Sequence, residues 1–239
     1  MTEKISVIIP TFNERNNIVP LIDEIHKELK SHEHEIIVVD DNSPDGTYKI
    51  VSRLEKPYLQ AVLRTDRRSM GYSVRCGIEQ ASGEIIVIMD SDFNHQPCYL
   101  PVIIETLSGF ECVSASRFIE GGRMNRRWRH WSSLLFNRMV GSALGGHVSD
   151  YLYGFIACRR KSLELCDYDK IFYGFGDFSM RLLCDLEKNR VKIKEIGVVN
   201  GDRRGGKSSN NLLLTFVQYS FEAVKLVFRS RTRNLCTKE

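Results

Sequence analysis

The chain has 239 residues, of which 42% are hydrophobic, as in an ordinary folded protein. Lysine and arginine number 34 against 30 aspartates and glutamates, so the formal net charge is a modest +4. These values exclude a largely disordered chain and suit one well-buried α/β domain with a small appendage.

The cysteines and the apolar stretches indicate the compartment. The seven cysteines form no Cys-x-x-Cys pair and no zinc-ligand spacing, their number is odd, and no signal peptide precedes them. Reduced thiols facing the cytosol are therefore expected. The longest apolar stretch, 212–228, is broken by Gln218, Glu222 and Lys225, which argues against a transmembrane helix.

Apolar strands and amphipathic helices alternate along the first half of the chain. We expect strands at 5–10, 35–41, 61–63 and 85–89, and helices at 18–29, after 47, at 70–81 and at 100–107. This alternation predicts a parallel sheet built from right-handed βαβ units. Further along, we expect helices at 132–144, 175–187 and 212–229, and strands at 154–158 and 191–199.

Two of these strands end in acidic residues. Asp90 and Asp92 follow the strand at 85–89, and Asp41 closes the strand at 35–41. Side chains at i and i+2 on extended backbone point to the same side, so Asp90 and Asp92 can converge on one cation. Ligands of open α/β sheets bind at this edge, and paired carboxylates suit Mg²⁺ or Mn²⁺. The alternative is an acidic turn without a metal.

Basic side chains gather in two later regions of the chain. The first comprises Arg117, Arg123, Arg126, Arg127, Arg129 and Arg138, and the second Arg203, Arg204, Lys207, Lys225, Arg229, Arg231 and Arg233. Positive charge gathered in this way suits an anionic ligand or a membrane surface.

The order of these motifs resembles the family 2 glycosyltransferases, which have the GT-A fold. The resemblance rests on Pro10-Thr11-Phe12-Asn13-Glu14, on the run from Val39 to Thr47 and on Met89-Asp90-Ser91-Asp92. A set of later residues makes the dolichol-phosphate mannose synthase-like (polyprenol-phosphate glycosyltransferase) branch the closer match. These are Ser116-Arg117, Gly121-Gly122, Arg129, Ser133, Asn137, Arg203, Gly206 and Ser208.

The resemblance implies a GT-A domain at 1–210, an α/β fold with a mostly parallel sheet flanked by helices. A C-terminal amphipathic helix and basic tail would follow at 211–239.

The resemblance also implies roles for individual residues. The nucleotide sugar would be held by Pro10, Phe12, Glu14, Asp41 and Asp90. The metal would be held by Asp90, Asp92 and Asn94. The catalytic set would join Asp92 to the residues that gather the acceptor phosphate, namely Arg117, Arg129, Ser133 and Arg203.

The implied reaction is the inverting transfer of a hexose from a nucleotide sugar to a polyprenyl or dolichyl phosphate. GDP-mannose is the favoured donor and UDP-glucose the next. Bound Mg²⁺ or Mn²⁺ would stabilise the departing nucleoside diphosphate, and an ionised phosphate nucleophile needs no strong general base. The alternatives are a family 2 enzyme with a non-lipid glycan acceptor and a catalytically silent nucleotide-sugar-binding subunit. No nucleic-acid partner is expected.

The chain departs from the branch in two motifs. Asn94 stands where the family usually has glutamine, so it is one methylene shorter. The segment Asp150-Tyr151-Leu152-Tyr153-Gly154-Phe155-Ile156 lacks the Thr-Ser pair and the arginine that the branch commonly carries there. Because of this departure, the sugar and acceptor specificity of the branch cannot be transferred directly to this chain.

Relatives in this branch continue into transmembrane helices or dock on membrane-anchored partner subunits. For this chain we expect peripheral attachment to the cytosolic face of a membrane. The apolar face of the last helix either covers the sheet or lies in the bilayer interface. That face comprises Leu213, Phe216, Val217, Phe221, Val224 and Phe228.

Four side chains near these motifs have ordinary structural alternatives. Glu14 suits the first turn of a helix as well as a nucleotide contact, and the motif order favours the contact. We expect His95 to hydrogen-bond the backbone rather than a metal. Asp177 either faces the sugar or caps the following helix, and Trp131 either packs or lies at a membrane interface.

Overall fold

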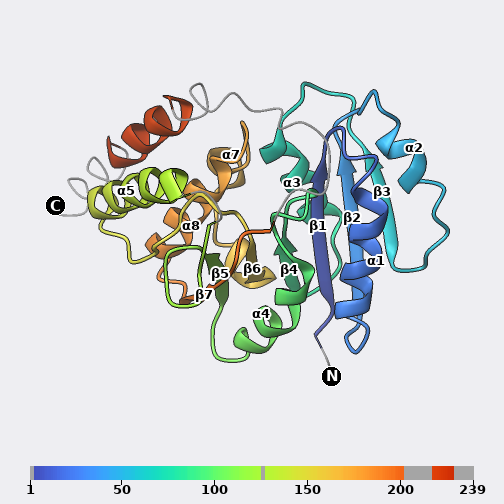
Figure 1. The fold of residues 1–239 in the computed structure, drawn as a ribbon, viewed down its shortest axis with the longest axis horizontal. Helices are drawn as coiled ribbons and strands as arrows, with labels where there is room; N and C mark the ends of the chain where they lie inside the picture. Colours follow the sequence, from blue (N-terminus) through green and yellow to red (C-terminus); the bar gives the residue numbers. More distant parts are fainter. Residues whose placement is uncertain (1–2, 125–126, 202–216, 229–239) are drawn as a thin grey trace.

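The computed structural model describes residues 3–124, 127–201 and 217–228, and these residues contain a seven-stranded sheet (Figure 1). The strand order is β3-β2-β1-β4-β6-β5-β7. The strands are β1 (Ile5–Thr11), β2 (His34–Asp40), β3 (Leu59–Leu63), β4 (Ile85–Ile88), β5 (Cys112–Ser116), β6 (Ile156–Arg159) and β7 (Ile193–Gly197). Neighbouring strands are parallel except around β6, which is antiparallel to both β4 and β5. The mostly parallel α/β sheet is confirmed, but β6 shows that the sheet is not parallel throughout.

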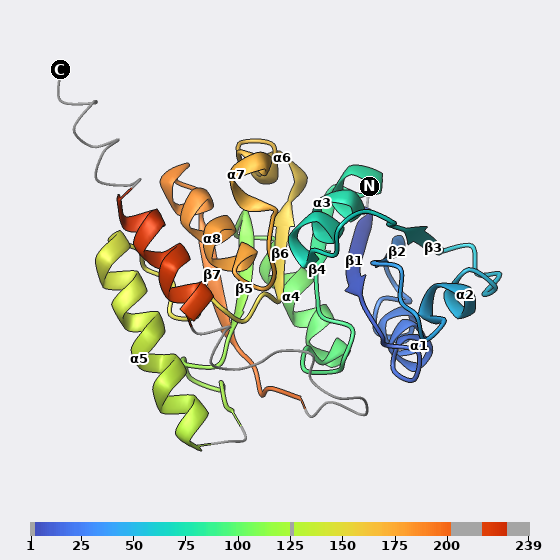
Figure 2. The ribbon, with the colours of Figure 1, turned by 90° about the horizontal axis from the view of Figure 1, so that it is seen from above.

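Helices cover both faces of the sheet (Figures 1 and 2). They are α1 (Ile18–Glu28), α2 (Thr47–Val51), α3 (Met70–Gln80), the 3₁₀ turn η1 (Pro97–Tyr99), α4 (Leu100–Thr106), α5 (Arg127–Leu144), α6 (Arg160–Leu163), α7 (Tyr168–Ile171) and α8 (Phe178–Lys188). One buried cluster joins the sheet to α1, α2 and α4, and the other joins it to α3, α5 and α8.

Period-two alternation along the strands separates these two clusters. In β1, Val7 and Ile9 belong to one cluster, and Ile8 between them belongs to the other. The helix α3 approaches the sheet closely at Gly77, where an added Cβ would lie 2.3 Å from a methyl group of Ile8. The apolar runs of β1 and β4 are therefore buried on both faces, as the sequence predicts.

The helix α5 begins earlier than the expected range of 132–144, so the end of the basic run before it is helical. The reason is that apolar side chains lie on both sides of this helix. Phe136 and Val140 are buried, whereas Trp131 is 66% exposed, and this mixture blurs the helical period in the sequence. Trp131 contacts the His130 ring edge-on but is not buried in the core, and its place at a membrane interface stays a prediction. The short helices α6 and α7 were not expected from the sequence at all.

The last helix, expected at 212–229, is helical over its described part, 217–228. Its apolar face points outward, because the exposed fractions of Val217, Phe221, Val224 and Phe228 are 44%, 65%, 53% and 65%. The alternative in which this face covers the sheet is therefore wrong for the described residues. Leu213, Phe216 and the expected domain boundary at residue 210 lie outside them. None of the described helices combines the length and the apolar character that crossing a bilayer requires.

A half-buried carboxylate connects the amino ends of three strands. Glu35 of β2 accepts hydrogen bonds from the Ser6 hydroxyl of β1 at 2.6 Å and from the Ser82 backbone N–H at 2.6 Å, just before β4. Lys4 Nζ lies 3.1 Å from its other oxygen. Burial opposes the charge, but the hydrogen bonds from Ser6, Ser82 and Lys4 outweigh it and lower the pKa of Glu35 from 4.5 to about 2.

We expect Glu35→Gln to lower the free energy of unfolding at pH 7 by about 1–2 kcal/mol, because a carboxylate acceptor is lost from a partly buried network. The folded-state pKa is depressed, so this stabilisation is complete above pH 4.5 and is lost as pH falls towards 2. Urea unfolding at several pH values measures it. The exposed Glu33→Gln is the control. Equal losses in the two variants, or a Glu35→Gln difference that persists unchanged at pH 2–3, would contradict the prediction.

Candidate active site

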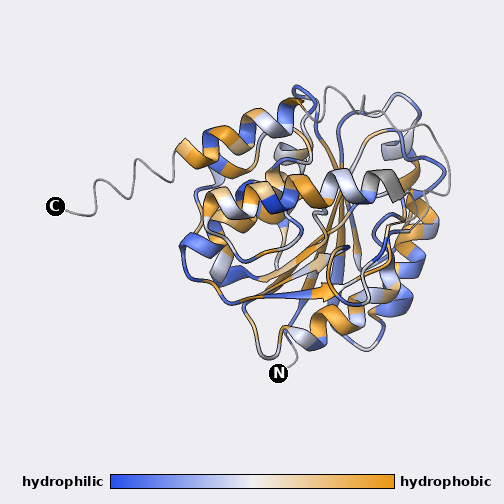
Figure 3. Cartoon of the chain, turned by 60° about the vertical axis from the view of Figure 1, so that its left-hand side comes forward, coloured by the Kyte–Doolittle hydropathy of each residue, from blue (hydrophilic) through white to orange (hydrophobic). Residues whose placement is uncertain are grey.

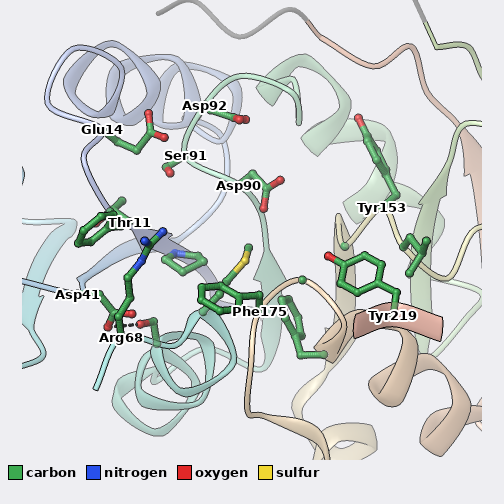
Figure 4. A pocket seen from close by; sticks show the side chains of 18 residues that line it. Thr11, Glu14, Asp41, Arg68, Asp90, Ser91, Asp92, Tyr153, Phe175 and Tyr219 are labelled. Carbon is green, nitrogen blue, oxygen red and sulfur yellow. Dashed lines mark hydrogen bonds between the residues drawn. The ribbon is translucent and has the colours of Figure 1, made fainter. Parts of the chain in front are cut away.

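A pocket of about 220 Å³ opens at the carboxyl ends of β1 and β4, next to the end of β2 (Figure 4). One wall comes from the β1 and β2 ends and from the segment before α3. It comprises Pro10, Thr11, Phe12, Glu14, Asp41 and Arg68. The opposite wall comes from the segments around β6 and α8 and from the last helix. It comprises Leu152, Tyr153, Gly154, Phe175, Gly176 and Tyr219. Asp90, Ser91 and Asp92 lie between these two walls.

The two acidic strand ends meet in this pocket, as the sequence predicts. The backbone N–H of Asp41 donates to the Thr11 carbonyl at 3.0 Å on one side of β1. The backbone N–H of Met89 donates to the Ile8 carbonyl at 3.1 Å on the other side. Because both neighbours of β1 run parallel to it, Asp41 and Asp90 arrive at one edge of the sheet.

Asp41 is held in a network of its own. Its Oδ1 accepts from the Ser73 hydroxyl at 2.6 Å and pairs with Arg64, and its Oδ2 accepts from the Ser69 backbone N–H at 2.8 Å. The Arg64 side chain is only 10% exposed. The guanidinium and two donors therefore fix the position of the Asp41 carboxylate at the pocket wall.

Phe12 forms a stacked pair in the same wall. The Arg68 guanidinium carbon lies 3.7 Å from the centre of the Phe12 ring. Burial lowers the pKa of Arg68, and the charge of Asp41 opposes this shift. Glu14, which also lines the pocket, accepts a hydrogen bond from the Asn17 amide at 2.7 Å at the start of α1. Glu14 therefore precedes α1, whose first turn holds no acidic residue, and it lines the pocket wall; its nucleotide contact stays a prediction.

The Asp90–Asn94 segment is a bent loop, because β4 ends at Ile88 and Phe93 has a φ of 66°. The extended backbone that was expected to align Asp90 and Asp92 is therefore wrong. Both carboxylates still line the pocket, since the turn brings them back to it.

Asp90 and Asp92 are the residues of this loop that could bind a divalent cation. Among the described residues, no group of three or more His, Cys, Asp or Glu side chains is placed to bind a metal. Two carboxylates are nevertheless what Mg²⁺ commonly takes from a protein, while substrate phosphates and water supply the rest. Asn94 is placed differently, because its side-chain amide donates to Asp92 Oδ2 at 2.7 Å and it does not line the pocket. Here Asn94 orients Asp92, and its role as a direct ligand stays a prediction.

His95 holds this loop in place through the backbone. The Asp90 backbone N–H donates to His95 Nδ1 at 2.8 Å, so the proton sits on Nε2, which donates to the Tyr153 carbonyl at 2.8 Å. The ring is 1% exposed, and burial lowers the pKa of His95 to about 4. The imidazole is therefore neutral near pH 7. The expected backbone-bonded histidine is confirmed.

Arg117 follows β5 and lies beside Tyr153. Its Nε and Nη2 donate to the fully buried Asp150 at 2.7 and 2.8 Å, and its Cζ lies 4.9 Å from the centre of the Tyr153 ring. Burial disfavours the charged form of Arg117. The attraction of Asp150, together with smaller contributions from Tyr153 and Asp90, is larger and raises the pKa of Arg117. Asp150, in the segment that departs from the branch, thus fixes the guanidinium next to the pocket.

Of the other residues assigned to the acceptor phosphate, only Ser133 has a described side chain, and it is not among the residues that line the pocket. Ser133 lies on α5, where its carbonyl accepts from the Asn137 amide at 2.9 Å. Arg129 belongs to the first turn of α5, but its side chain lies outside the described residues, as does the whole of Arg203. Their roles remain predictions.

Sequence reasoning missed several pocket residues. Arg68 and Phe175 carry no motif, and Tyr219 lies on a helix whose only visible signal was its apolar face. Tyr153 falls within the divergent segment, and its hydroxyl donates to the Asn94 carbonyl at 2.8 Å. Asp177 neither caps α8 with its side chain nor lines the pocket, because it pairs with Arg181.

Comparisons with known proteins agree with this geometry. Residues 6–166 match the model of Glycosyl transferase family 2. A dolichol-phosphate mannosyltransferase of Pyrococcus furiosus is 32% identical over 215 residues, which cover 86% of this chain and 58% of that protein. A dolichol-phosphate mannosyltransferase of Saccharomyces cerevisiae is 29% identical, with coverage of 98% and 91%.

Among solved structures, glucosyl-3-phosphoglycerate synthase from Mycobacterium tuberculosis, in complex with Mn²⁺, UDP and glucosyl-3-phosphoglycerate, superposes with a TM-score of 0.72. Its sequence identity is 22%, and the match covers 95% of this chain and 80% of that chain, so it bears on the fold alone. Since the family match extends over more than half of the sequence, the chain belongs to glycosyl transferase family 2 and is a glycosyltransferase with the GT-A fold.

Proposed function

We propose that this protein transfers a hexose from a nucleotide sugar to a polyprenyl phosphate, with inversion at the anomeric carbon and with Mg²⁺ or Mn²⁺. The observation that carries the proposal is the convergence of Asp41, Asp90 and Asp92 on one pocket between two walls. A nucleotide sugar is long and carries its charge in the middle. Such a ligand fits a pocket of this form. The aromatic and polar wall can bind the nucleoside, the two central carboxylates can bind a cation beside the diphosphate, and the second wall lies beyond them.

Each part of the donor has a counterpart in the pocket. The nucleoside lies along Pro10, Phe12 and Asp41, and the diphosphate lies against Asp90 and Asp92. A divalent cation held by these two carboxylates supplies charge stabilisation to the departing diphosphate. The relatives named mannosyltransferases favour GDP-mannose as the donor, and the structural neighbour crystallised with UDP makes a uridine nucleotide the second candidate.

The acceptor phosphate reacts without a strong base. One of its oxygens forms the bond to the anomeric carbon while the bond from that carbon to the diphosphate breaks, and the electron pair leaves with the nucleoside diphosphate. The nucleophile is already ionised near neutral pH, which fits a site whose one buried histidine, His95, is neutral and occupied by backbone. Two of the five N–H donors of Arg117 go to Asp150, and under this proposal the others would orient the phosphate. Arg129, Ser133 and Arg203 would complete its binding.

The outer surface of two neighbouring helices supports a lipid acceptor. Figures 1 and 2 place the helix at 217–228 beside α5, and Figure 3 shows apolar residues along both. We name the exposed side chains of these helices the apolar surface. It comprises Trp131, Leu135 and Met139 of α5, exposed by 66%, 60% and 53%, together with Val217, Phe221, Val224 and Phe228.

The apolar surface carries exposed cations. Arg138 lies next to Met139, and Lys225, with a 56% exposed side chain, lies next to Val224. Large apolar side chains interspersed with cations are the composition of helices that bind anionic bilayers. We infer that this surface rests on the cytosolic face of the membrane that contains the acceptor. Direct contact with lipid is the simpler reading, and a membrane-anchored partner subunit on the same surface is the alternative.

We expect Asp92→Asn to lower hexose transfer at least about 100-fold, because one of the two carboxylates for the cation loses its charge. Transfer is measured as glycolipid formed from each nucleotide sugar and a polyprenyl phosphate with Mn²⁺, and again after chelation. Calorimetry of Mn²⁺ binding to the complex with GDP gives a readout independent of turnover. Asp169→Asn, at an exposed position on α7, is the control. Full transfer by Asp92→Asn, with an unchanged melting temperature, would exclude the proposed role of this carboxylate.

We expect Leu135→Glu combined with Phe221→Glu to weaken binding to vesicles that contain anionic lipid and polyprenyl phosphate by about tenfold or more, since two apolar side chains leave the lipid phase. Affinity for GDP should not change. Val102→Glu on α4, 44% exposed in the wild type, is the matched control. Undiminished vesicle binding by the double variant would contradict the membrane assignment, and normal binding combined with a requirement for a second protein would favour the partner subunit.

A further inference from the structure

The helix at 217–228 turns one side chain into the pocket. Tyr219 lines the second wall, and Figure 4 shows its ring on the opposite side of Asp90 from Thr11, Glu14 and Asp41. This helix therefore takes part in the active site as well as in the apolar surface. The only side chain of this helix among the residues that line the pocket is Tyr219.

The hydroxyl of Tyr219 lies close to Gly176. It makes no hydrogen bond among those of the described residues. A Cβ added to Gly176 would lie 2.4 Å from this oxygen, so the hydroxyl rests directly on the glycine backbone. Burial raises the pKa of the phenol, and the charges of Asp177 and Asp90 raise it further. The group thus stays neutral and can both donate and accept a hydrogen bond.

A buried ionic network fixes the helix that carries Tyr219. Glu222, one turn further on, accepts from the Tyr173 hydroxyl at 2.9 Å and from Lys225 at 2.7 Å, and lies 3.4 Å from Arg181. Arg181 is 1% exposed and also pairs with Asp177. Buried charges that satisfy one another in this way define one arrangement of the groups that carry them.

The same network also fixes the loop under the tyrosine. Asp177 Oδ1 accepts from the Phe175 backbone N–H at 2.9 Å, and Gly176 lies between these two residues. The position of the Tyr219 hydroxyl relative to Gly176 is therefore set from both sides, by the helix and by the loop.

We propose that the Tyr219 hydroxyl hydrogen-bonds a hydroxyl group of the transferred hexose and contributes to the choice of sugar. The inference rests on the proposed function and deepens it. In a nucleotide sugar the diphosphate lies between the nucleoside and the sugar. If the nucleoside lies along Asp41 and the diphosphate at Asp90, the sugar lies against the second wall. Around Tyr219 this wall offers aromatic rings and a neutral hydroxyl. These lining groups match the hydroxyl groups of a sugar. The charges of Arg181 and Arg117 act on the Tyr219 phenol, but neither arginine lines the pocket, whereas a phosphate would call for cations in the lining.

The test is a comparison of two ligands by calorimetry with Mn²⁺. We expect Tyr219→Phe to weaken binding of intact GDP-mannose by about 3- to 10-fold, which is the loss of one neutral hydrogen bond, and to leave binding of GDP unchanged. The same pair of measurements with UDP-glucose and UDP covers the alternative donor. Tyr168→Phe, a partly buried tyrosine of α7 outside the pocket, is the control.

Equal affinities in wild type and Tyr219→Phe would overturn the inference while leaving the proposed function intact. An equal loss for GDP and GDP-mannose would also overturn it, since the effect would then be on the fold or the nucleotide. A rise in the KM for polyprenyl phosphate alone would assign the tyrosine to the acceptor and overturn the sugar contact. If the wild type binds no nucleotide sugar, the proposed function fails and the inference falls with it.

A second variant tests the position of the hydroxyl. The methyl group of Gly176→Ala meets only the end of the Tyr219 side chain, so it should displace the hydroxyl and weaken GDP-mannose binding in the same way. In the Tyr219→Phe background, where the oxygen is gone, Gly176→Ala should have little further effect. Fully additive losses would show that the two residues act separately and would overturn the proposed geometry.

Discussion

The parallel pairing of β1 with both of its neighbours is the constraint on which the site depends. Thr11 pairs with Asp40 on one side, and Ile8 pairs with Ile88 on the other, so the two acidic strand ends emerge on either side of β1. A slip of one residue in either pairing would turn the side chains of that strand to the opposite face. The burial of β1 and β4 on both faces makes such a slip costly, and the core therefore fixes the place of the acids.

Three carboxylates around the site are each paired with an arginine. Asp41 pairs with Arg64, Asp150 with Arg117, and Asp177 with Arg181. A buried carboxylate without such a partner would shift its pKa and become neutral. Asp90 lines the pocket with a side chain that is 32% exposed, and the neighbouring His95 ring is held by backbone groups. In the proposed complex the Asp90 carboxylate would face the cation and the diphosphate.

Much of the fold could be predicted from the sequence, because its signals are local. Apolar runs of β-branched residues identify β1, β2 and β4, and the acids that follow β2 and β4 can be read directly. The direction of β6 could not be read, since a short apolar strand has the same composition in either direction. Nor did the sequence show that Asp90 and Asp92 meet through a bent loop, because the positive φ at Phe93 has no local marker such as glycine.

The second wall was the least predictable part of the site for the same physical reason. Tyr219 lies more than 120 residues beyond Asp90, and its helix was recognisable only by an apolar face that turns out to face away from the core. Helical periodicity identifies which residues share a face but not whether that face turns inward. Here the inward face is held by the ion pair of Glu222 with Arg181 and by the buried Ala223 and Leu226. Under the two proposals made for this helix, it would present apolar side chains to a bilayer and the Tyr219 hydroxyl to the sugar. The binding of lipid and of donor would then be coupled through one helix.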